Sequence, residues 1–266
     1  LKREIKIIFI SSLTSSLISN LFSALSILLI SKLSGIELLG EYATIRSIFG
    51  ILSIIFGFRI NDAIDRNIVQ IKDNKIKFET INSLLKSIFT CSALVFLVGF
   101  IIVFNLNKFE FSFLTSLFFG LSIIFNSLNP IWAGIARHEL DKLQLILSLN
   151  IEIIFRSIFI ILFLYLLKLN MLTIAACHLL SSFISLILGN NYIRKYLSQL
   201  KENIGSYKYI YPWRLNNNPN LWPQLKSTYL VDTFSGITAK FDLLAIAYLY
   251  NAELVGIFKL TKIIFL

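Results

Sequence analysis

Charge is scarce in this sequence. Only 15% of its 266 residues are charged, whereas a soluble domain carries roughly a quarter, and 56% are hydrophobic. This shortage of charge excludes a soluble globular domain. The composition is typical of a polytopic membrane protein, in which apolar runs of about 20 residues cross the bilayer.

Cysteine and histidine are equally rare, with two of each. Cys91 and Cys177 lie inside apolar runs, where a thiol behaves as a small hydrophobic side chain and indicates nothing about the redox compartment. His138 lies in a short loop and His178 in a helix, and neither has a second His or a Cys at metal-ligand spacing. We therefore expect no metal site and no cofactor. The chain also lacks a glycine-rich phosphate loop, an HExxH motif and a Ser/His/Asp set outside the apolar runs, so no catalytic residue is predicted.

The sequence does contain a series of long apolar runs. They are continuous rather than alternating with a period of two, which favours membrane-spanning helices over a barrel. The first run is longer than the ~7–15-residue core of a signal peptide, so we expect an uncleaved helix there. The predicted fold class is an all-α membrane protein, a polytopic helical bundle. The runs cover residues 5–33, 38–58, 84–104, 111–136, 143–167, 171–189 and 227–250, and an eighth begins near 254.

Basic residues are distributed unevenly between the connections. Cytoplasmic loops carry an excess of Lys and Arg, so the N-terminus is predicted to be inside, with residues 34–37, 105–110 and 168–170 outside. The formal charge of +10 then reflects membrane topology, and no nucleic-acid partner is expected. The inner segments carry fifteen basic residues and the outer loops three: Lys2, Arg3, Lys6, Arg66, Lys72, Lys75, Lys77, Arg137, Lys142, Arg194, Lys195, Lys201, Lys208, Arg214 and Lys226, against Lys32, Lys108 and Lys168.

One phrase of the sequence occurs twice. ELVGIFKLTKIIF at 253–265 aligns without a gap on ELLGEYATIRSIF at 37–49, at a constant offset of 216, and Arg46 becomes Lys262. Six predicted helices separate the copies, so both lie on the outer side and run in the same direction. This arrangement predicts a parallel repeat whose halves are related by an axis along the membrane normal.

The repeat divides the chain into three parts. We expect a six-helix transmembrane bundle at 1–189, a cytoplasmic or interfacial linker at 190–225, and the start of a second bundle at 226–266. Three of the four prolines fall near the linker's C-terminal half, where they break any helix. The chain begins with Leu1 and stops within an apolar run, as expected of a fragment of a protein with about twelve helices.

Ionisable side chains within the apolar runs are the candidate functional residues, because a charge at membrane depth is costly unless it faces protein or a water-filled cavity. Glu152 and Arg156 are four residues apart and share a helix face, which predicts an ion pair that either locks the helix or contacts cargo. Lys240 lies ~21 Å along its helix from Lys226, near mid-bilayer. Asp242 lies on a different face, so one of the two should face a cavity and the other a neighbouring helix.

Arg46 and Lys262 occupy equivalent positions in the repeat, each ~9 Å inside the outer boundary. We predict a two-sided cationic collar that engages pyrophosphate or acidic sugars; the alternative is that each residue snorkels separately to the outer headgroups. Near the cytoplasmic end, Arg59 is a further candidate, while snorkelling is preferred for Asp62. The predicted substrate-binding residues are Arg46, Arg59, Arg156, Lys240 and Lys262, with Glu152 and Asp242 in coupling or structural ion pairs.

Three segments of the chain resemble a known family. They are GIELLGEYATIRSIFGILSIIFGFRINDAIDR at 35–66, IARHELDKLQLILSLNIEIIFR at 135–156 and KFDLLAIAYLYNAELVGIF at 240–258. These segments resemble the polysaccharide-repeat-unit flippases, the Wzx type of O-antigen translocase, whose superfamily also contains MATE drug exporters and lipid II flippases. The residues that carry the resemblance are Gly40, Tyr42, Gly57, Ala63, Arg66, Lys240, Asp242 and Gly256.

The resemblance implies two six-helix bundles around a cavity that opens alternately to each side of the bacterial inner membrane. Its cargo would be an undecaprenyl-pyrophosphate-linked oligosaccharide for O-antigen (lipopolysaccharide) or capsular polysaccharide assembly. The implied partners are this lipid-linked oligosaccharide, membrane lipids and the polysaccharide polymerase machinery.

Three other functions fit the sequence less well. A MATE-like exporter of small organic cations should have an acidic cavity, whereas the embedded charges here lean basic. A membrane-embedded enzyme of polysaccharide assembly would need a carboxylate cluster at one interface, and Asp62 and Asp65 are only weak evidence for one. A structural scaffold gives no reason to bury charges.

Overall fold

The protein is an all-α bundle, as predicted. The computed structural model describes residues 2–57, 71, 73–106, 112–166, 170–202, 235, 237–238 and 240–264. Within this part of the chain the labelled helices are α1 (Lys2–Ser34), α2 (Ile36–Gly57), α4 (Asn74–Phe104), α5 (Phe113–Asn126), α6 (Asn129–His138), α7 (Lys142–Leu166), α8 (Met171–Glu202) and α10 (Ala252–Ile264). Residues 240–249 are also helical.

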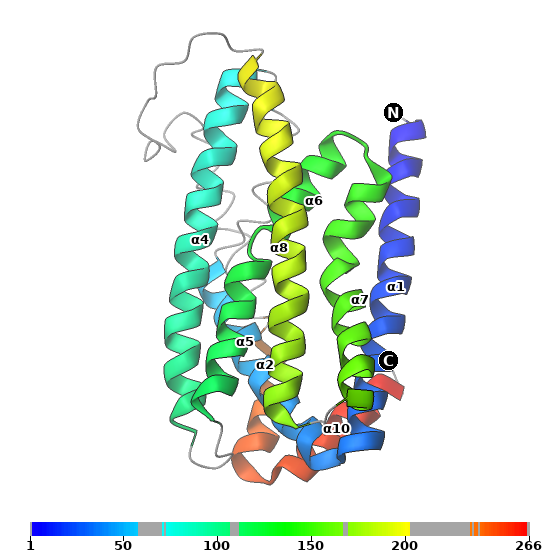
Figure 1. Ribbon diagram of the computed structural model, residues 1–266, viewed down its shortest axis with the longest axis vertical. Coiled ribbons are helices and arrows are strands. Elements are labelled where there is room, and N and C mark those ends of the chain that lie inside the picture. The colour runs from blue at the N-terminus through cyan, green and yellow to red at the C-terminus, as the bar shows by residue number, and fades with distance from the viewer. Residues whose placement is uncertain are drawn as a thin grey trace.

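Six segments of the described chain are long and apolar enough to cross a membrane. They run up and down beside one another, with the N-terminus of α1 and the C-terminus of α8 at the same end of the bundle (Figure 1). Lipid offers no hydrogen-bond partners, so each span must satisfy its backbone polar groups within its own helix. The segments are Ile8–Ser34, Ile36–Phe56, Asn74–Phe104, Phe113–His138, Lys142–Phe163 and Met171–Glu202.

Two helices are longer than their apolar runs. α4 begins at Asn74, ten residues before the predicted start, where the Asp73 side chain accepts hydrogen bonds from the first free N–H groups. α8 continues to Glu202, beyond the predicted end at 189. Both extensions have the same cause: residues of the two extended parts, such as Ile81 and Tyr196, belong to one buried cluster. Tertiary packing thus prolongs helices that hydropathy alone ends early.

The predicted run 111–136 is broken in the structure. α5 ends at Asn126 and α6 begins at Asn129, with Pro130 in its first turn, because the proline ring is not tolerated inside a continuous helix. Side chains on either side of the break bind α8: the Asn126 amide donates to Ser182 Oγ at 2.8 Å, and Ser185 Oγ donates to Asn129 Oδ1 at 2.8 Å. One side-chain hydrogen bond to α8 on each side of the break therefore holds it in place.

The two copies of the repeated phrase pack directly against each other. α2 and α10 meet at the end of the bundle opposite the N-terminus (Figure 1). A methyl group added at Gly40 would overlap the carbonyl oxygen of Ala252, and one added at Gly256 would overlap the carbonyl oxygen of Ile36. Since 252 is 36 + 216 and 256 is 40 + 216, the two contacts are equivalent. This reciprocity is what a two-fold axis between the copies requires.

Candidate functional site

A cavity of ≈ 140 Å³ lies between α2, α5 and the helical segment 240–249. Its polar lining includes two cationic side chains and two serines, and its apolar lining is mainly aromatic. The lining residues are Arg46, Phe49, Gly50, Ser53, Phe119, Ser122, Ile123 and Lys240.

α2 presents one face to this cavity. Arg46, Gly50 and Ser53 are four and three residues apart, so they lie on the same side of the helix. Between them, Ile45 and Ile48 are buried with exposed fractions of 0% and 7% and hold the helix against its neighbours. Arg46 itself is exposed, so the cavity is open beside this side chain.

Lys240 reaches the cavity because Gly50 has no side chain. The Lys240 ammonium lies against the α2 backbone at Gly50, where a Cβ atom would overlap Nζ and would come within 3.0 Å of Cε. A cation thus occupies the space beside a glycine, one helical turn from Arg46. The sequence predicted that either Lys240 or Asp242 would face a cavity, and in the structure Lys240 is among the lining residues.

The cavity has a positive electrostatic character. Among the described residues that line it, the charged ones are Arg46 and Lys240, and none is a carboxylate. Lys240 also interacts electrostatically with Lys259 of α10, which in turn interacts with Arg46. Lys259 itself does not line the cavity and also interacts with Asp242. An anion placed between Arg46 and Lys240 would be stabilised by both of these cations.

Asp242 and Lys262 lie elsewhere. The Lys262 ammonium donates to Asp242 Oδ2 at 2.9 Å, and the other carboxylate oxygen accepts from the Leu243 N–H at 2.8 Å. Asp242 therefore faces α10 while Lys240 faces the cavity, as the spacing of the two residues predicts. Lys262, in contrast, is bound to a carboxylate and does not line the cavity. The cation that faces the cavity with Arg46 is Lys240, which corrects the geometry predicted for the collar.

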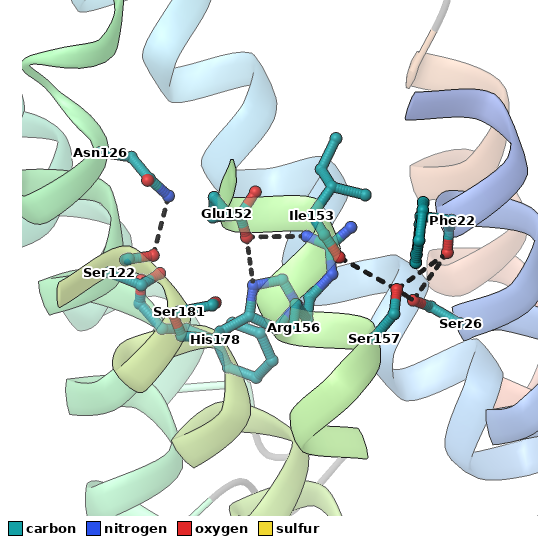
Figure 2. A network of polar contacts seen from close by, with 12 residues as sticks. Phe22, Ser26, Ser122, Asn126, Glu152, Ile153, Arg156, Ser157, His178 and Ser181 are labelled. Carbon is teal, nitrogen blue, oxygen red and sulfur yellow. Dashed lines mark hydrogen bonds and ion pairs between the residues drawn. The ribbon is translucent and has the colours of Figure 1, made fainter. Parts of the chain in front are cut away.

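A second polar cluster is buried between α2, α7 and α8. Arg156 donates to Glu152 Oε1 at 2.9 Å, which confirms the predicted pair, and His178 Nδ1 lies 3.4 Å from the same oxygen. Figure 2 shows Glu152 with interactions to both residues. On its other side, the His178 ring has Nε2 3.0 Å from the Tyr42 hydroxyl. Arg156 and His178 are 3% and 1% exposed, so the cluster is buried inside the helical bundle.

Small polar residues join α1 to α7 beside this cluster. Ser26 and Ser157 share a hydrogen bond of 2.7 Å, and the Asn150 amide donates to Ser15 Oγ at 2.7 Å (Figure 2 shows the first pair). In lipid, helices associate through such close packing and interhelical hydrogen bonds rather than through hydrophobic burial. These α1–α7 hydrogen bonds therefore hold α7 against α1 and keep the Glu152–Arg156 pair in position.

Several sequence-based expectations lie outside the described residues. Arg59, Asp62 and Asp65 do, and so does most of the linker predicted at 190–225. Conversely, sequence reasoning missed Tyr42, His178 and Lys259. His178 was set aside because it lacks metal-ligand neighbours, but the rule that selected Glu152, an ionisable group inside an apolar run, applies equally to it.

Comparisons with known proteins agree with this architecture. No family model and no curated protein matches the chain. A solved structure of the MATE multidrug transporter DinF-BH is similar over 99% of this chain, with a TM-score of 0.68 and 15% sequence identity. The chain spans 60% of the length of that transporter. This chain therefore shares the helical fold of that part of the MATE structure.

Proposed function

We propose that this chain forms part of a flippase that moves an undecaprenyl-pyrophosphate-linked oligosaccharide across the bacterial inner membrane by alternating access. The observation that supports this proposal is the cavity lined by Arg46 and Lys240 with no carboxylate among its described lining residues. A pyrophosphate group is the part of such a cargo that needs neutralising inside a membrane. The similarity of the fold to that of a MATE transporter also supports a role in transport.

The two cations have complementary roles in this proposal. The Arg46 guanidinium is a planar fork suited to bidentate contact with phosphate oxygens, whereas Lys240 acts as a point charge. Phe49 and Phe119, which are 4% and 2% exposed, add an apolar wall to the same cavity. Such a wall packs against the apolar face of a sugar ring or the first prenyl unit.

A MATE-like exporter of small molecules is the second candidate, and the similarity to a multidrug transporter favours it. A carboxylate without an ion-pair partner would favour a cationic cargo. Glu152 is held by Arg156, and Asp242 is held by Lys262. The charge of the cargo therefore separates the two proposals. The similarity to a transporter gives no support to the enzyme of polysaccharide assembly.

Translocation in proteoliposomes tests the proposed function. We expect Lys240→Ala to reduce transfer of a fluorescent undecaprenyl-pyrophosphate-linked saccharide by about tenfold or more, since a hydrogen bond to a charged group contributes ~1.5–3 kcal/mol. Lys240→Arg should retain part of the activity because it keeps the charge. Lys142→Ala, which removes an exposed cation at the start of α7, is the matched control.

Either of two results would contradict the proposal. One is normal transfer by the Lys240→Ala protein at equal protein content. The other is transport of a permeant organic cation with no transfer of the lipid-linked saccharide, which would favour the small-molecule exporter.

A further inference from the structure

Two serines line the cavity together with the two cations, and the proposed function leaves them unused. Ser53 belongs to α2 and Ser122 to α5, and they are the uncharged polar side chains among the described lining residues. Ser122 is 4% exposed. Buried polar groups are hydrogen-bonded, so the present partner of each hydroxyl group decides what that group can still offer to a bound molecule.

The hydrogen of each serine hydroxyl is already used within its own helix. Ser53 Oγ donates to the Phe49 carbonyl oxygen at 2.7 Å. Ser122 Oγ donates to the Phe119 carbonyl oxygen, also at 2.7 Å. The direction is fixed because a carbonyl oxygen only accepts, and a hydroxyl group has one hydrogen and two acceptor lone pairs. Each serine therefore still offers an acceptor to the cavity.

The same kind of bond occurs elsewhere in the bundle. Ser87 of α4 donates to the Ser83 carbonyl oxygen at 3.0 Å, and serines inside helices commonly bond to a preceding carbonyl group. The bond alone therefore indicates no function. Ser53 and Ser122 differ from Ser87 in their place, since they line one cavity from two helices and Ser87 does not line it.

The two cations in the cavity offer the opposite kind of group. A guanidinium and an ammonium group have N–H donors and no acceptor. Arg46 and Ser53 are seven residues apart on α2, which is about two helical turns along one face. Gly50, beside which the Lys240 ammonium lies, comes between them. The cavity thus combines donors on two cations with acceptors on two serines.

A bare anion matches only half of this pattern. The oxygens of fully ionised pyrophosphate accept hydrogen bonds from the cations, but they have no hydrogen to donate to the serines. A prenyl chain has neither donors nor acceptors. A phosphate ester that carries hydroxyl groups close to the phosphate matches both halves, because its phosphate oxygens accept and its hydroxyl groups donate.

Each serine also lies beside an aromatic ring of the cavity wall. Ser53 follows Phe49 by four residues and Ser122 follows Phe119 by three, so ring and hydroxyl share a helix face in both helices. Both phenylalanines line the cavity. A sugar ring has apolar C–H faces and hydroxyl groups around its edge, and therefore fits a wall on which aromatic rings alternate with acceptors.

We propose that Ser53 and Ser122 determine specificity for the group attached to the phosphate, by accepting hydrogen bonds from its hydroxyl groups. The class of ligand is a sugar phosphate, the part of the proposed cargo in which the saccharide joins the pyrophosphate. This inference rests on the proposed function, since it requires a phosphate group bound by Arg46 and Lys240. It adds the residues that distinguish a sugar from an apolar group of the same ring size.

The test compares two diphosphates that share charge and ring size and differ in their hydroxyl groups. Binding of glucose 1-diphosphate and of cyclohexyl diphosphate to the protein in phosphatidylcholine nanodiscs is measured by titration calorimetry. We expect Ser53→Ala and Ser122→Ala each to lower the ratio of the first affinity to the second by about two- to tenfold, the factor typical of one hydrogen bond. Ser87→Ala, which removes the same kind of helix bond outside the cavity, is the matched control and should leave the ratio unchanged.

The ratio of the two affinities separates recognition from other roles of the serines. A serine that only supports its helix would lower the affinity for both diphosphates equally. A serine that turns its hydroxyl hydrogen toward the phosphate would do the same. An unchanged ratio in the Ser53→Ala or Ser122→Ala protein therefore overturns the role assigned to that serine.

A lipid headgroup could offer the same chemistry, since phosphatidylglycerol carries hydroxyl groups close to a phosphate. Nanodiscs with added phosphatidylglycerol distinguish the two sources. We expect the ratio of the two affinities to be nearly the same in both kinds of nanodisc. A ratio that phosphatidylglycerol lowers to the value of the Ser122→Ala protein would assign the serines to the lipid headgroup and overturn their role in cargo recognition.

The failures of the two proposals are distinguishable in the same titrations. If both diphosphates bind and the serine variants keep the original ratio, the specificity inference is wrong and the proposed anion site stands. If neither diphosphate binds, the proposed anion site and the specificity inference are both wrong.

Discussion

Single charged residues in this bundle have two different environments. Glu152 and Arg156 are buried as a pair, whereas Arg46 and Lys240 line a cavity in which no described residue supplies a carboxylate. The pairing was predictable because residues four apart on one helix share a face. The contact of His178 with Tyr42, 136 residues away, was not predictable, because helix periodicity carries no information on which faces of distant helices meet.

The ion pair provides a prediction about stability. Removing one partner of a buried pair leaves an uncompensated charge and costs about 3–5 kcal/mol, whereas removing both is far less costly. We expect Glu152→Gln and Arg156→Gln each to lower the midpoint of thermal unfolding in detergent, and the double variant to recover much of the loss. Additive losses in the double variant would show that the two side chains act independently.

Gly50 provides a prediction about the cavity. Gly50→Ala places a methyl group where the Lys240 ammonium lies, and the flexible end of the lysine moves away at little energetic cost. We therefore expect pyrophosphate binding to weaken while the thermal unfolding midpoint and membrane level are nearly unchanged. The same binding measurement on Lys240→Ala gives the reference value. Unaltered affinity in Gly50→Ala would show that pyrophosphate binding does not depend on the position of the Lys240 ammonium beside Gly50.

At the scale of the elements, close backbone approach is the distinguishing feature of the α2–α10 contact. Helices in lipid approach closely where small residues face each other, and here a glycine on each helix faces a carbonyl group of the other. The apolar runs follow from the sequence, whereas the break at Pro130 was not predicted, although the proline that causes it is visible in the sequence. The extra turns of α4 and α8 do not follow from the sequence, because they depend on packing between residues that are distant in the chain.

The crossing provides a prediction about both copies of the repeat. Overpacking costs about 1–3 kcal/mol, and at these positions the obstacle is backbone, which cannot rotate away. We expect Gly40→Ala and Gly256→Ala to lower the thermal unfolding midpoint by similar amounts, since the two contacts are equivalent. A loss confined to one of the two variants would contradict the two-fold relation.

At the scale of the whole molecule, the arrangement of the helices was largely predictable and the site was predictable only in part. Hydropathy and basic-residue bias led to an up-and-down bundle, and the described chain has six candidate spans in that order. The cavity joins α2, α5 and residues 240–249, a combination that depends on three-dimensional packing. Lys240 was identified from its depth alone; its position beside Gly50 was not.

Membrane orientation is the prediction at this scale. The basic-residue bias places the N-terminus inside, and in the structure α8 ends at the same end of the bundle as the N-terminus (Figure 1). In a background with Cys91 and Cys177 replaced by Ala, a cysteine at Glu37 should react with an impermeant maleimide from outside intact cells, and one at Lys201 should not. Both positions are exposed, so a difference in labelling between them does not reflect burial within the protein. Labelling of position 201 from outside would reverse the topology.

The reciprocal contact of Gly40 and Gly256 has a consequence for how this chain evolves. A contact in which position i meets j and j meets i has the form of a homodimer interface, here formed within one polypeptide. In a homodimer every substitution appears twice, whereas in the fused form each copy changes alone. The two copies differ in this way: position 46 carries an arginine that lines the cavity, while its counterpart Lys262 binds Asp242. The two copies of the repeat thus share one symmetric backbone contact, while their side chains at equivalent positions have different partners.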